Sequence, residues 1–268
     1  MALDDLDPEA EVLVMPRYLA GPGGLDLQMA WPLPFEEGWL LHQPGDGDAV
    51  GVSPCQRVRL GFTPDPTGVH GPGGGTWQTH IHTDPFALAA WTMTFSGAVP
   101  LEILRDAHTE VLSLYLEGLH GERDWLTETG DTSASAGYLP LLTAGWSHTV
   151  DSDGKQTFRS PETSAFLRHW YSPRKPAALN PTWTFRADIP GEPLLWQATF
   201  TTGTPASVIA AVTTSLVEAL PLARTVRELP AQSRTHVRYS PSLPAPPPAP
   251  RPLRIPPRPP APPAGRSR

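Results

Sequence analysis

The chain presents the same series of landmark residues twice, at a nearly constant spacing. From Trp31 to Leu119 the order is an aromatic residue, a Gly-Trp pair, a Ser-Pro turn, a lone Trp, Trp-x-x-Thr-Phe, a proline and a helical run; from Tyr138 to Leu220 this order returns. A unit that occurs twice usually buries its apolar face against its twin. We therefore expect two similar units that form a pseudo-twofold pair. The corresponding residues, offset by 107 to 105 positions, are Gly38-Trp39 and Gly145-Trp146, Ser53-Pro54 and Ser160-Pro161, Trp77 and Trp183, Trp91-Thr94-Phe95 and Trp196-Thr199-Phe200, and Pro100 and Pro205.

Periodicity within each unit predicts strands followed by a helix. Residues 58–62 alternate apolar and polar side chains, which is typical of a half-buried strand. Pro100 and Pro205 stand where a helix tolerates proline, at its first turn, and helically spaced apolar residues follow both. The sequence predicts an α+β fold in which each unit is an antiparallel sheet of about four to five strands followed by one helix.

Composition divides the chain into four segments. We expect a first repeat unit at residues 12–120, a polar linker at 121–137, a second unit at 138–223 and a disordered basic tail at 224–268. Much of the tail is Pro, Ala and Arg without apolar periodicity, so burial cannot offset the entropy of ordering it. Arg254 and Arg258 lie in an Arg-x-x-Pro-x-x-Pro spacing that suits aromatic grooves; the alternative is an unspecific spacer.

Charge is distributed unevenly along the chain. Residues 1–223 hold 26 acidic and 11 basic side chains (11 − 26 = −15), whereas residues 224–268 hold nine arginines and one glutamate (9 − 1 = +8). An acidic body repels phosphate backbones, so binding of nucleic acid requires a local basic patch or the tail.

Localisation is inferred from three absences in the sequence. The single Cys55 excludes an intrachain disulfide. The first residues have neither the basic nor the apolar region of a signal peptide, and no run approaches the roughly 18 apolar residues of a membrane span. We expect a cytoplasmic protein that does not bind a membrane.

The strongest catalytic candidate is a short run with metal-ligand spacing. His80 and His82 share one face of a predicted strand and Asp84 follows, so the three resemble part of the His-x-His-x-Asp-His zinc motif of metallo-β-lactamase-like hydrolases. Pro85 replaces the last histidine of that motif, and the second unit has Arg186 and Asp188 at the matching positions. We interpret the pair as two exposed strand histidines, with a metal-dependent hydrolase as a remote alternative.

Other signatures of catalysis are missing. The sequence has no Gly-x-Ser-x-Gly elbow and no glycine-rich phosphate-binding loop between a strand and a helix. Cys55 is interpreted as a turn residue rather than a nucleophile. We therefore expect no catalytic activity and no cofactor.

Aromatic residues fall into a repeated and an unrepeated set. Trp39, Trp91, Trp146 and Trp196 recur in register and are expected in the core. The unrepeated set lies beside positive charge, in the one basic aromatic cluster of the acidic body. The candidate binding residues there are Arg168, Trp170, Tyr171, Arg174 and Lys175.

Several blocks of sequence resemble the actinobacterial domain-of-unknown-function 317 family, which often occurs as tandem copies. The blocks lie at residues 15–21, 38–39, 53–62 and 84–95, with Pro100 after them, and the similarity covers roughly residues 12–222. Cys55-Gln56 departs from the Asp-Gly turn expected of the family, and the second copy keeps little of the 57–61 block. The resemblance implies a cytoplasmic actinobacterial protein and supplies no catalytic residues.

These observations leave three functional hypotheses. The first is a non-enzymatic binding or adaptor protein with an unknown protein partner. The second is binding of single-stranded nucleic acid, by analogy with the tandem sheet-plus-helix layout of Whirly and Pur-alpha proteins. The third is the metal-dependent hydrolase. The sequence does not distinguish a monomer from a homodimer.

Overall fold

The computed structural model describes residues 3–65, 74–127, 133–170 and 181–241. Of the candidate binding residues, Arg168 and Trp170 lie within these ranges. The others lie outside the described residues: Tyr171, Arg174, Lys175, Arg254 and Arg258.

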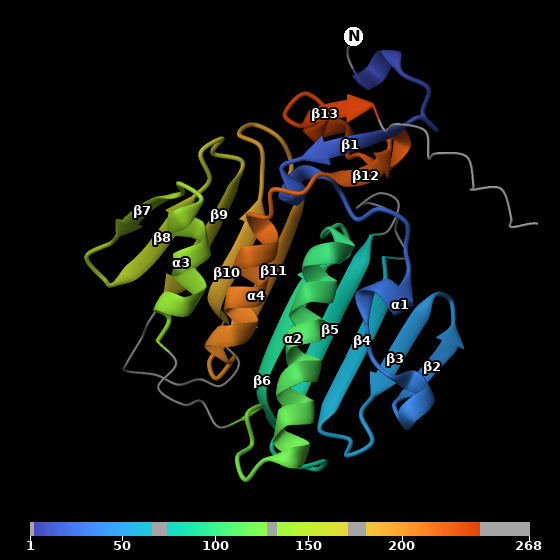
Figure 1. Ribbon diagram of the computed structural model, residues 1–268, viewed down its shortest axis with the longest axis vertical. Helices are drawn as coiled ribbons and strands as arrows, with labels where there is room; N and C mark the ends of the chain where they lie inside the picture. The colour runs from blue at the N-terminus through green and yellow to red at the C-terminus, as the bar shows by residue number, and fades with distance from the viewer. Residues whose placement is uncertain (1–2, 66–73, 128–132, 171–180, 242–268) are drawn as a thin grey trace, which may run out of the picture.

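Ten antiparallel strands form one continuous sheet, five from each repeat (Figure 1). Their order is β2-β3-β4-β5-β6-β11-β10-β9-β8-β7, so the strands of the second half follow in the reverse order of those of the first. The predicted α+β class, with about five antiparallel strands and a following helix in each unit, is confirmed. The strands are β2 (Leu40–Gly45), β3 (Asp48–Val52), β4 (Val58–Pro64), β5 (Gly75–His82), β6 (Ala89–Ser96), β7 (Ser147–Val150), β8 (Lys155–Arg159), β9 (Ala165–Trp170), β10 (Pro181–Ala187) and β11 (Trp196–Thr201).

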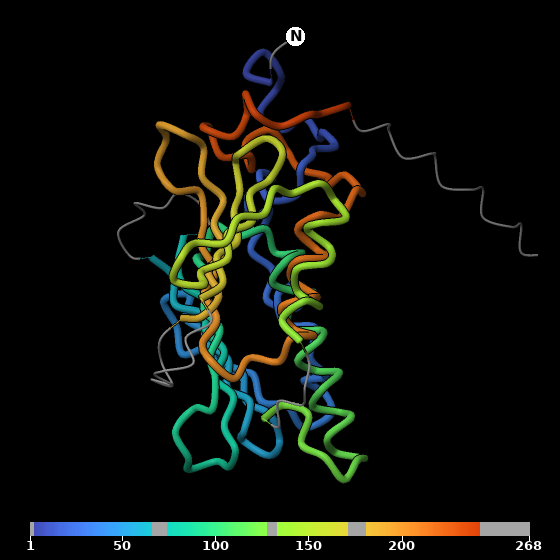
Figure 2. The backbone as a smooth tube through the Cα atoms, turned by 90° about the vertical axis from the view of Figure 1, so that its left-hand side faces the viewer, coloured from blue at the N-terminus to red at the C-terminus, as the bar shows by residue number. Residues whose placement is uncertain are grey.

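Helices cover one face of this sheet (Figure 2). The long helix of each unit follows the proline expected at its start, Pro100 for α2 (Leu101–His120) and Pro205 for α4 (Ala206–Leu216). Each unit also has a helix before its strands that the sequence did not predict, α1 (Leu27–Ala30) and α3 (Ser135–Thr143). The helices and the sheet enclose a single apolar core that draws on both units. As expected, it contains the repeated tryptophans Trp39, Trp91, Trp146 and Trp196, and the repeated pair Trp77 and Trp183 is buried there too.

The two halves join edge to edge between β6 and β11. Thr94 pairs with Thr199, its own counterpart in the repeat, so the pseudo-twofold axis passes between them. The backbone ladder contains only three residue pairs, and two side chains extend it. The Thr201 hydroxyl accepts the amide of Thr92 at 2.8 Å, and the Ser96 hydroxyl accepts the amide of Gln197 at 3.1 Å. These two bonds are symmetry equivalents, because each residue lies 105 positions from its counterpart.

In each half, a backbone carbonyl outside the ten-stranded sheet accepts a hydrogen bond from one repeated tryptophan. The Trp91 indole donates to the carbonyl of Leu126 at 2.7 Å, and the Trp196 indole donates to the carbonyl of Tyr18 at 2.8 Å. Buried indole N–H groups usually find such partners, although those of Trp31 and Trp77 have none among the described residues. Leu126 is buried although it lies in the predicted linker, so part of residues 121–137 belongs to the core of the first half.

A second, three-stranded sheet lies at one end of the helices (Figure 1). It has the order β12-β1-β13, formed by β1 (Glu11–Met15), β12 (Leu222–Thr225) and β13 (Arg238–Pro241). The structure therefore differs from the expectation that the tail begins at residue 224 and that β1 extends the first unit. Residues 224–241 are ordered because Val226, Leu229 and Val237 are buried.

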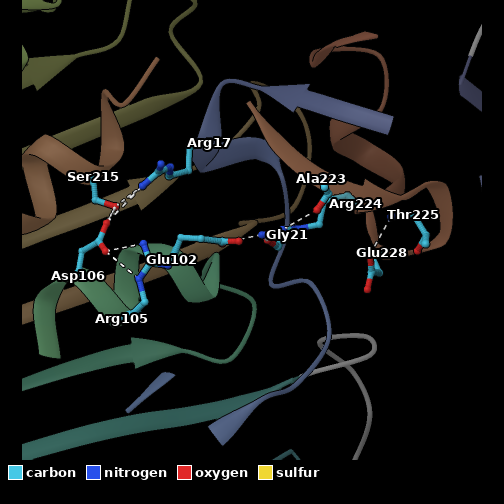
Figure 3. A network of polar contacts seen from close by, with 10 residues as sticks. All are labelled: Arg17, Gly21, Glu102, Arg105, Asp106, Ser215, Ala223, Arg224, Thr225 and Glu228. Carbon is cyan, nitrogen blue, oxygen red and sulfur yellow. Dashed lines mark hydrogen bonds and ion pairs between the residues drawn. The ribbon is translucent and has the colours of Figure 1, made fainter. Parts of the chain in front are cut away.

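Buried ion pairs attach this small sheet to the helices (Figure 3). Arg224 of β12 donates to Glu102 of α2 at 2.6 Å, and both side chains are 7 % exposed. Arg17 donates to the Ser215 hydroxyl of α4 at 2.8 Å, and that hydroxyl donates to Asp106 of α2 at 2.6 Å. The charged groups are thus paired where they are removed from water, as burial of charge requires.

Candidate functional site: the open face of the sheet

One face of the ten-stranded sheet faces away from the helices, and no described element covers it (Figure 2). Side chains alternate between faces along a strand. In β6 the buried Trp91, Met93 and Phe95 point toward the helices, so the partly exposed residues between them, such as Thr94, lie on the opposite side. We call this opposite side the open face.

A row of polar residues crosses the middle of the open face. Strand register aligns them in the order Thr157, Arg168, Thr184, Thr199, Thr94 and Gln78. Their β-branched threonines suit an extended backbone, and each hydroxyl is both a donor and an acceptor of hydrogen bonds. Such a surface is polar without being charged at its centre.

Positive charge gathers on the second half of the open face. Arg159 lies opposite Phe166 in the register, and Phe166 lies opposite Arg186. The guanidinium carbon of Arg168 lies 4.8 Å from the centre of the Phe166 ring and that of Arg186 lies 5.4 Å from it, both within the range of a cation–π contact. We call this group the basic patch; its members are Lys155, Arg159, Phe166, Arg168, Trp170 and Arg186.

Two arginines of the basic patch lack the carboxylate partners that several other body arginines have. Arg17 and Arg57 form ion pairs with Asp106 and Asp124. Arg159 and Arg168 are exposed, and within the described part of the chain neither has a carboxylate at ion-pair distance. Their charge is therefore available to a ligand.

The remaining cations of the patch have carboxylates close by. Lys155 lies 3.8 Å from Asp151 and from Asp153, and Arg186 lies 3.8 Å from Asp188. Partly exposed pairs of this length are weak. Lys155 and Arg186 therefore add to the positive potential less than Arg159 and Arg168 do.

The cations of the basic patch do not recur at the corresponding positions of the first half. At the repeat offset of 107 or 106 residues, Arg159, Arg168 and Arg186 correspond to Val52, Gly61 and His80. The buried tryptophans recur in both halves, whereas the open-face cations do not. The first half has one open-face arginine, Arg59 of β4 at the position of Phe166, and it donates to the carbonyls of Gln56 and Pro85. The fold thus accounts for the repeated residues, whereas the group of cations in the basic patch belongs to the second half.

The predicted histidine run ends in a turn between β5 and β6 that hydrogen bonds hold in place. The Asp84 carboxylate accepts the amides of Phe86 and Ala87 at 2.9 and 3.0 Å, and His82 Nδ1 lies 2.8 Å from the Ala87 carbonyl. His82 is buried by these contacts, so the expectation of two exposed histidines is wrong for this residue. Burial and the neighbouring His82 and Arg59 lower the pKa of His80. Among the described residues no group of three or more His, Cys, Asp or Glu could hold a metal ion.

The tip of the same turn carries two exposed apolar side chains. Phe86 is 95 % exposed and Leu88 is 92 % exposed. Arg59 donates to the carbonyl of Pro85, between the two ends of the turn, and helps to hold it in place. The turn therefore presents a phenyl ring and an isobutyl group on a restrained backbone.

Sequence reasoning found part of the basic patch and missed the rest. Arg168 and Trp170 were predicted as binding residues from their proximity in sequence, and the structure places both on β9 with exposed side chains. Arg159 and Arg186 lie on neighbouring strands and reach the patch through strand register. Phe166, Arg168 and Trp170 are spaced two residues apart, which indicates one face of a strand. The strand order is needed to place Arg159 and Arg186 beside them.

Comparisons with known proteins agree with the internal repeat. No curated protein and no solved structure matches the chain, and none of the helices in the described ranges has the length and apolar character to cross a membrane. The model of one family, described as SPDY: Domain of unknown function (DUF317), matches residues 52–116 and 159–222. Each match contains the Ser-Pro pair and the three inner strands of one half. The first match also contains most of α2, and the second contains all of α4. The chain therefore carries two copies of a stretch that matches the SPDY family, one in each half of the sheet.

Proposed function

We propose that this chain is a binding protein without catalytic activity, and that it takes an anionic ligand on the basic patch. The observation that supports this proposal is the exposure of Arg159 and Arg168 without carboxylate partners among the described residues, although residues 1–223 carry a net charge of −15. An acidic protein that leaves two adjacent arginines uncompensated has a local region of positive potential. A ligand with several anionic groups complements it.

The geometry also suits binding more than catalysis. The basic patch lies on a sheet rather than in loops around a cleft, so its groups are held at fixed spacing by strand register. Neighbouring strands lie about 4.8 Å apart, which places Arg159 and Arg186, two strands apart, about 10 Å from each other at the backbone. A ligand with repeated negative charges can contact both.

A titration with fluorescein-labelled heparin tests the proposal, because heparin is a polyanion without bases. The full-length chain is used with the arginines after residue 241 changed to serine, namely Arg251, Arg254, Arg258, Arg266 and Arg268, so that binding by this segment does not obscure the result. We expect Arg159→Ser/Arg168→Ser to weaken binding roughly tenfold or more, since bonds to charged groups contribute about 1.5–3 kcal/mol each.

The matched control removes two positive charges elsewhere. Arg227 and Arg238 are 65 % and 75 % exposed in their side chains and lie in or beside the three-stranded sheet. Arg227→Ser/Arg238→Ser should leave heparin affinity within about twofold. Equal weakening by the two double variants would show that only total charge matters and would overturn the proposal.

A protein partner is the second candidate, and the exposed apolar turn favours it. Phe86 and Leu88 project from a braced backbone, and rigid apolar anchors are typical of interface hot spots. In this adaptor role the partner supplies an apolar pocket. A photo-crosslinking residue at position 86 should then capture one defined protein from the source cells, while the same residue at the exposed Leu119 should not; equal capture at both positions would contradict the adaptor role.

We propose in addition that the two matched stretches make the chain a tandem member of the SPDY family. The order of blocks in the sequence supports this membership, as do the equivalent positions of the two matches in the sheet. The cytoplasmic location and the actinobacterial source implied by the resemblance stay predictions.

A further inference from the structure

We propose that the anionic ligand of the basic patch is single-stranded nucleic acid, with its phosphates on Arg159 and Arg168 and an unstacked base on Trp170. This inference rests on the proposed function, because it names the ligand of the same surface. Three features of the open face carry it: the position of the tryptophan, the hydroxyl row and the absence of a described helix above the surface.

Trp170 supplies an aromatic face beside the free cations. It lies on β9 two residues from Arg168, on the same face of the strand, and its side chain is 48 % exposed. Lys155 lies opposite it in the register. Phe166 cannot serve in the same way, because it is buried beneath the guanidinium groups of Arg168 and Arg186. An exposed aromatic ring next to arginines is the arrangement on which single-stranded bases stack.

The threonine row supplies polar contacts beyond the basic patch. Thr184, Thr199 and Thr94 continue from Arg168 toward the first half in one line across the strands. Hydroxyl groups hydrogen-bond to phosphate oxygens and sugars without reading sequence. A nucleic-acid strand that follows this row would leave the basic patch and cross the centre of the open face.

The exposure of Trp170 on the open face favours a single strand over a duplex. Bases in a duplex are stacked on one another and do not offer a free face to Trp170. The described residues also place no helix or hairpin above the open face that could enter a groove. The acidic remainder of the body opposes long contacts with the densely charged duplex, and salt shortens the range of this repulsion to about 8 Å at physiological ionic strength.

Fluorescence anisotropy with a labelled 20-nucleotide thymidine oligomer tests the inference, in the same full-length background with the five terminal arginines changed to serine. We expect Trp170→Ala to weaken binding of the oligomer by about 5- to 100-fold, the range of one stacked base. It should change heparin binding by less than twofold. Exposed Trp125→Ala serves as the matched aromatic control and should leave both affinities unchanged.

The salt dependence supplies a second readout. For a single strand the slope of log affinity against log salt falls by about 0.7 for each phosphate that the protein no longer neutralises. Arg159→Ser/Arg168→Ser should therefore reduce the slope by about 1.4, and Arg227→Ser/Arg238→Ser should not change it. An RNA oligomer of uridine and a DNA duplex of equal charge complete the series, with the single strands expected to bind at least tenfold more tightly than the duplex.

The outcomes separate this inference from the proposed function. Heparin binding that depends on Arg159 and Arg168, with no effect of Trp170→Ala on the oligomer, would overturn the nucleic-acid inference and leave the anionic site in place. A duplex that binds as tightly as the single strand would also overturn it. Failure of the parent chain itself to bind heparin and the oligomer would overturn both.

Discussion

Thr94 and Thr199 face each other across the junction of β6 and β11, and each is the counterpart of the other in the internal repeat. A pseudo-twofold axis through this pair joins two five-stranded sheets into one sheet of ten strands. The junction is short, so its side-chain bonds are important for the integrity of the whole sheet.

Both junction side chains should contribute to stability, Thr201 at least as much as Ser96, because the Thr201 hydroxyl also donates to the Thr92 carbonyl at 3.4 Å. Ser96→Ala removes the acceptor of the Gln197 amide, and Thr201→Val removes the acceptor of the Thr92 amide. Each change should lower the free energy of unfolding by about 1 kcal/mol, the typical contribution of one hydrogen bond. Urea denaturation measures both. Ser113→Ala on the exposed face of α2 is the control and should change the free energy by less than about 0.5 kcal/mol; junction variants no less stable than this control would contradict the account.

Glycine should stabilise the turn that follows each Ser-Pro pair. Gln56 and Thr163, which correspond in the repeat, have φ angles of 59° and 60°, a left-handed conformation that side chains disfavour. Replacement by glycine relieves this strain but adds entropy to the unfolded chain. We expect a net gain of roughly 0.5–1 kcal/mol, larger for the β-branched Thr163. Calorimetry measures the change, and Thr149→Gly in the edge strand β7 should instead destabilise the protein.

The buried pair of Glu102 and Arg224 should tolerate joint replacement better than single replacement. Glu102→Gln leaves the Arg224 guanidinium buried without its counter-charge, which costs about 3–5 kcal/mol. Glu102→Leu/Arg224→Met removes both charges and should recover most of this stability. Denaturation of the single and double variants checks the prediction. A double variant as unstable as Glu102→Gln would show that attachment of the small sheet needs the ion pair itself.

Stability should fall as the solution becomes moderately acidic. Burial lowers the pKa of His108 to about 4, and its ring lies between the Thr79 hydroxyl at 2.8 Å and the Leu104 carbonyl at 3.0 Å. Burial likewise lowers the pKa of His169 to about 4. As pH falls below about 6.5 the unfolded chain takes up these protons before the folded protein does, so the free energy of unfolding decreases until about pH 4.

The contribution of His108 to this decrease is roughly 3 kcal/mol, from 1.36 kcal/mol for each pH unit of displacement. His108→Gln removes the titrating group and keeps polar atoms near Thr79 and Leu104. Denaturation at pH 7, 6, 5 and 4 should then show a shallower decrease than in the parent chain. An identical pH profile for the two proteins would contradict the burial of a neutral His108.

Local sequence patterns predict strands of the large sheet, but they do not predict the long-range strand pairing of the small sheet. The repeat and the alternation at residues 58–62 predicted β4, and the prolines predicted α2 and α4. The partners of β1 lie more than 200 residues away, in a stretch of the chain whose arginines and prolines resemble a tail. The pairing of β12 and β13 with β1 and the burial of Val226, Leu229 and Val237 show that this stretch belongs to the fold.

The residues of the candidate site that share one strand were predictable from the sequence, and those on neighbouring strands were not. Arg168 and Trp170 share one strand, so proximity in sequence was enough to select them. Arg159 of β8 and Arg186 of β10 both lie opposite Phe166 in the strand register, and nothing local in the sequence fixes the register that brings them together. Helix α3 escaped prediction for a different reason, because Pro140 interrupts its interior.

Arginine footprinting with phenylglyoxal tests the central claim most directly, since it reports on individual guanidinium groups. The full-length chain with its five terminal arginines changed to serine is modified with and without saturating heparin, and peptides are quantified by mass spectrometry. The account predicts that Arg159 and Arg168 react at least fivefold more slowly when heparin is bound, while Arg227 and Arg238 react at unchanged rates. Equal protection of all four arginines, or none at Arg159 and Arg168, would contradict the assignment of the basic patch as the binding surface.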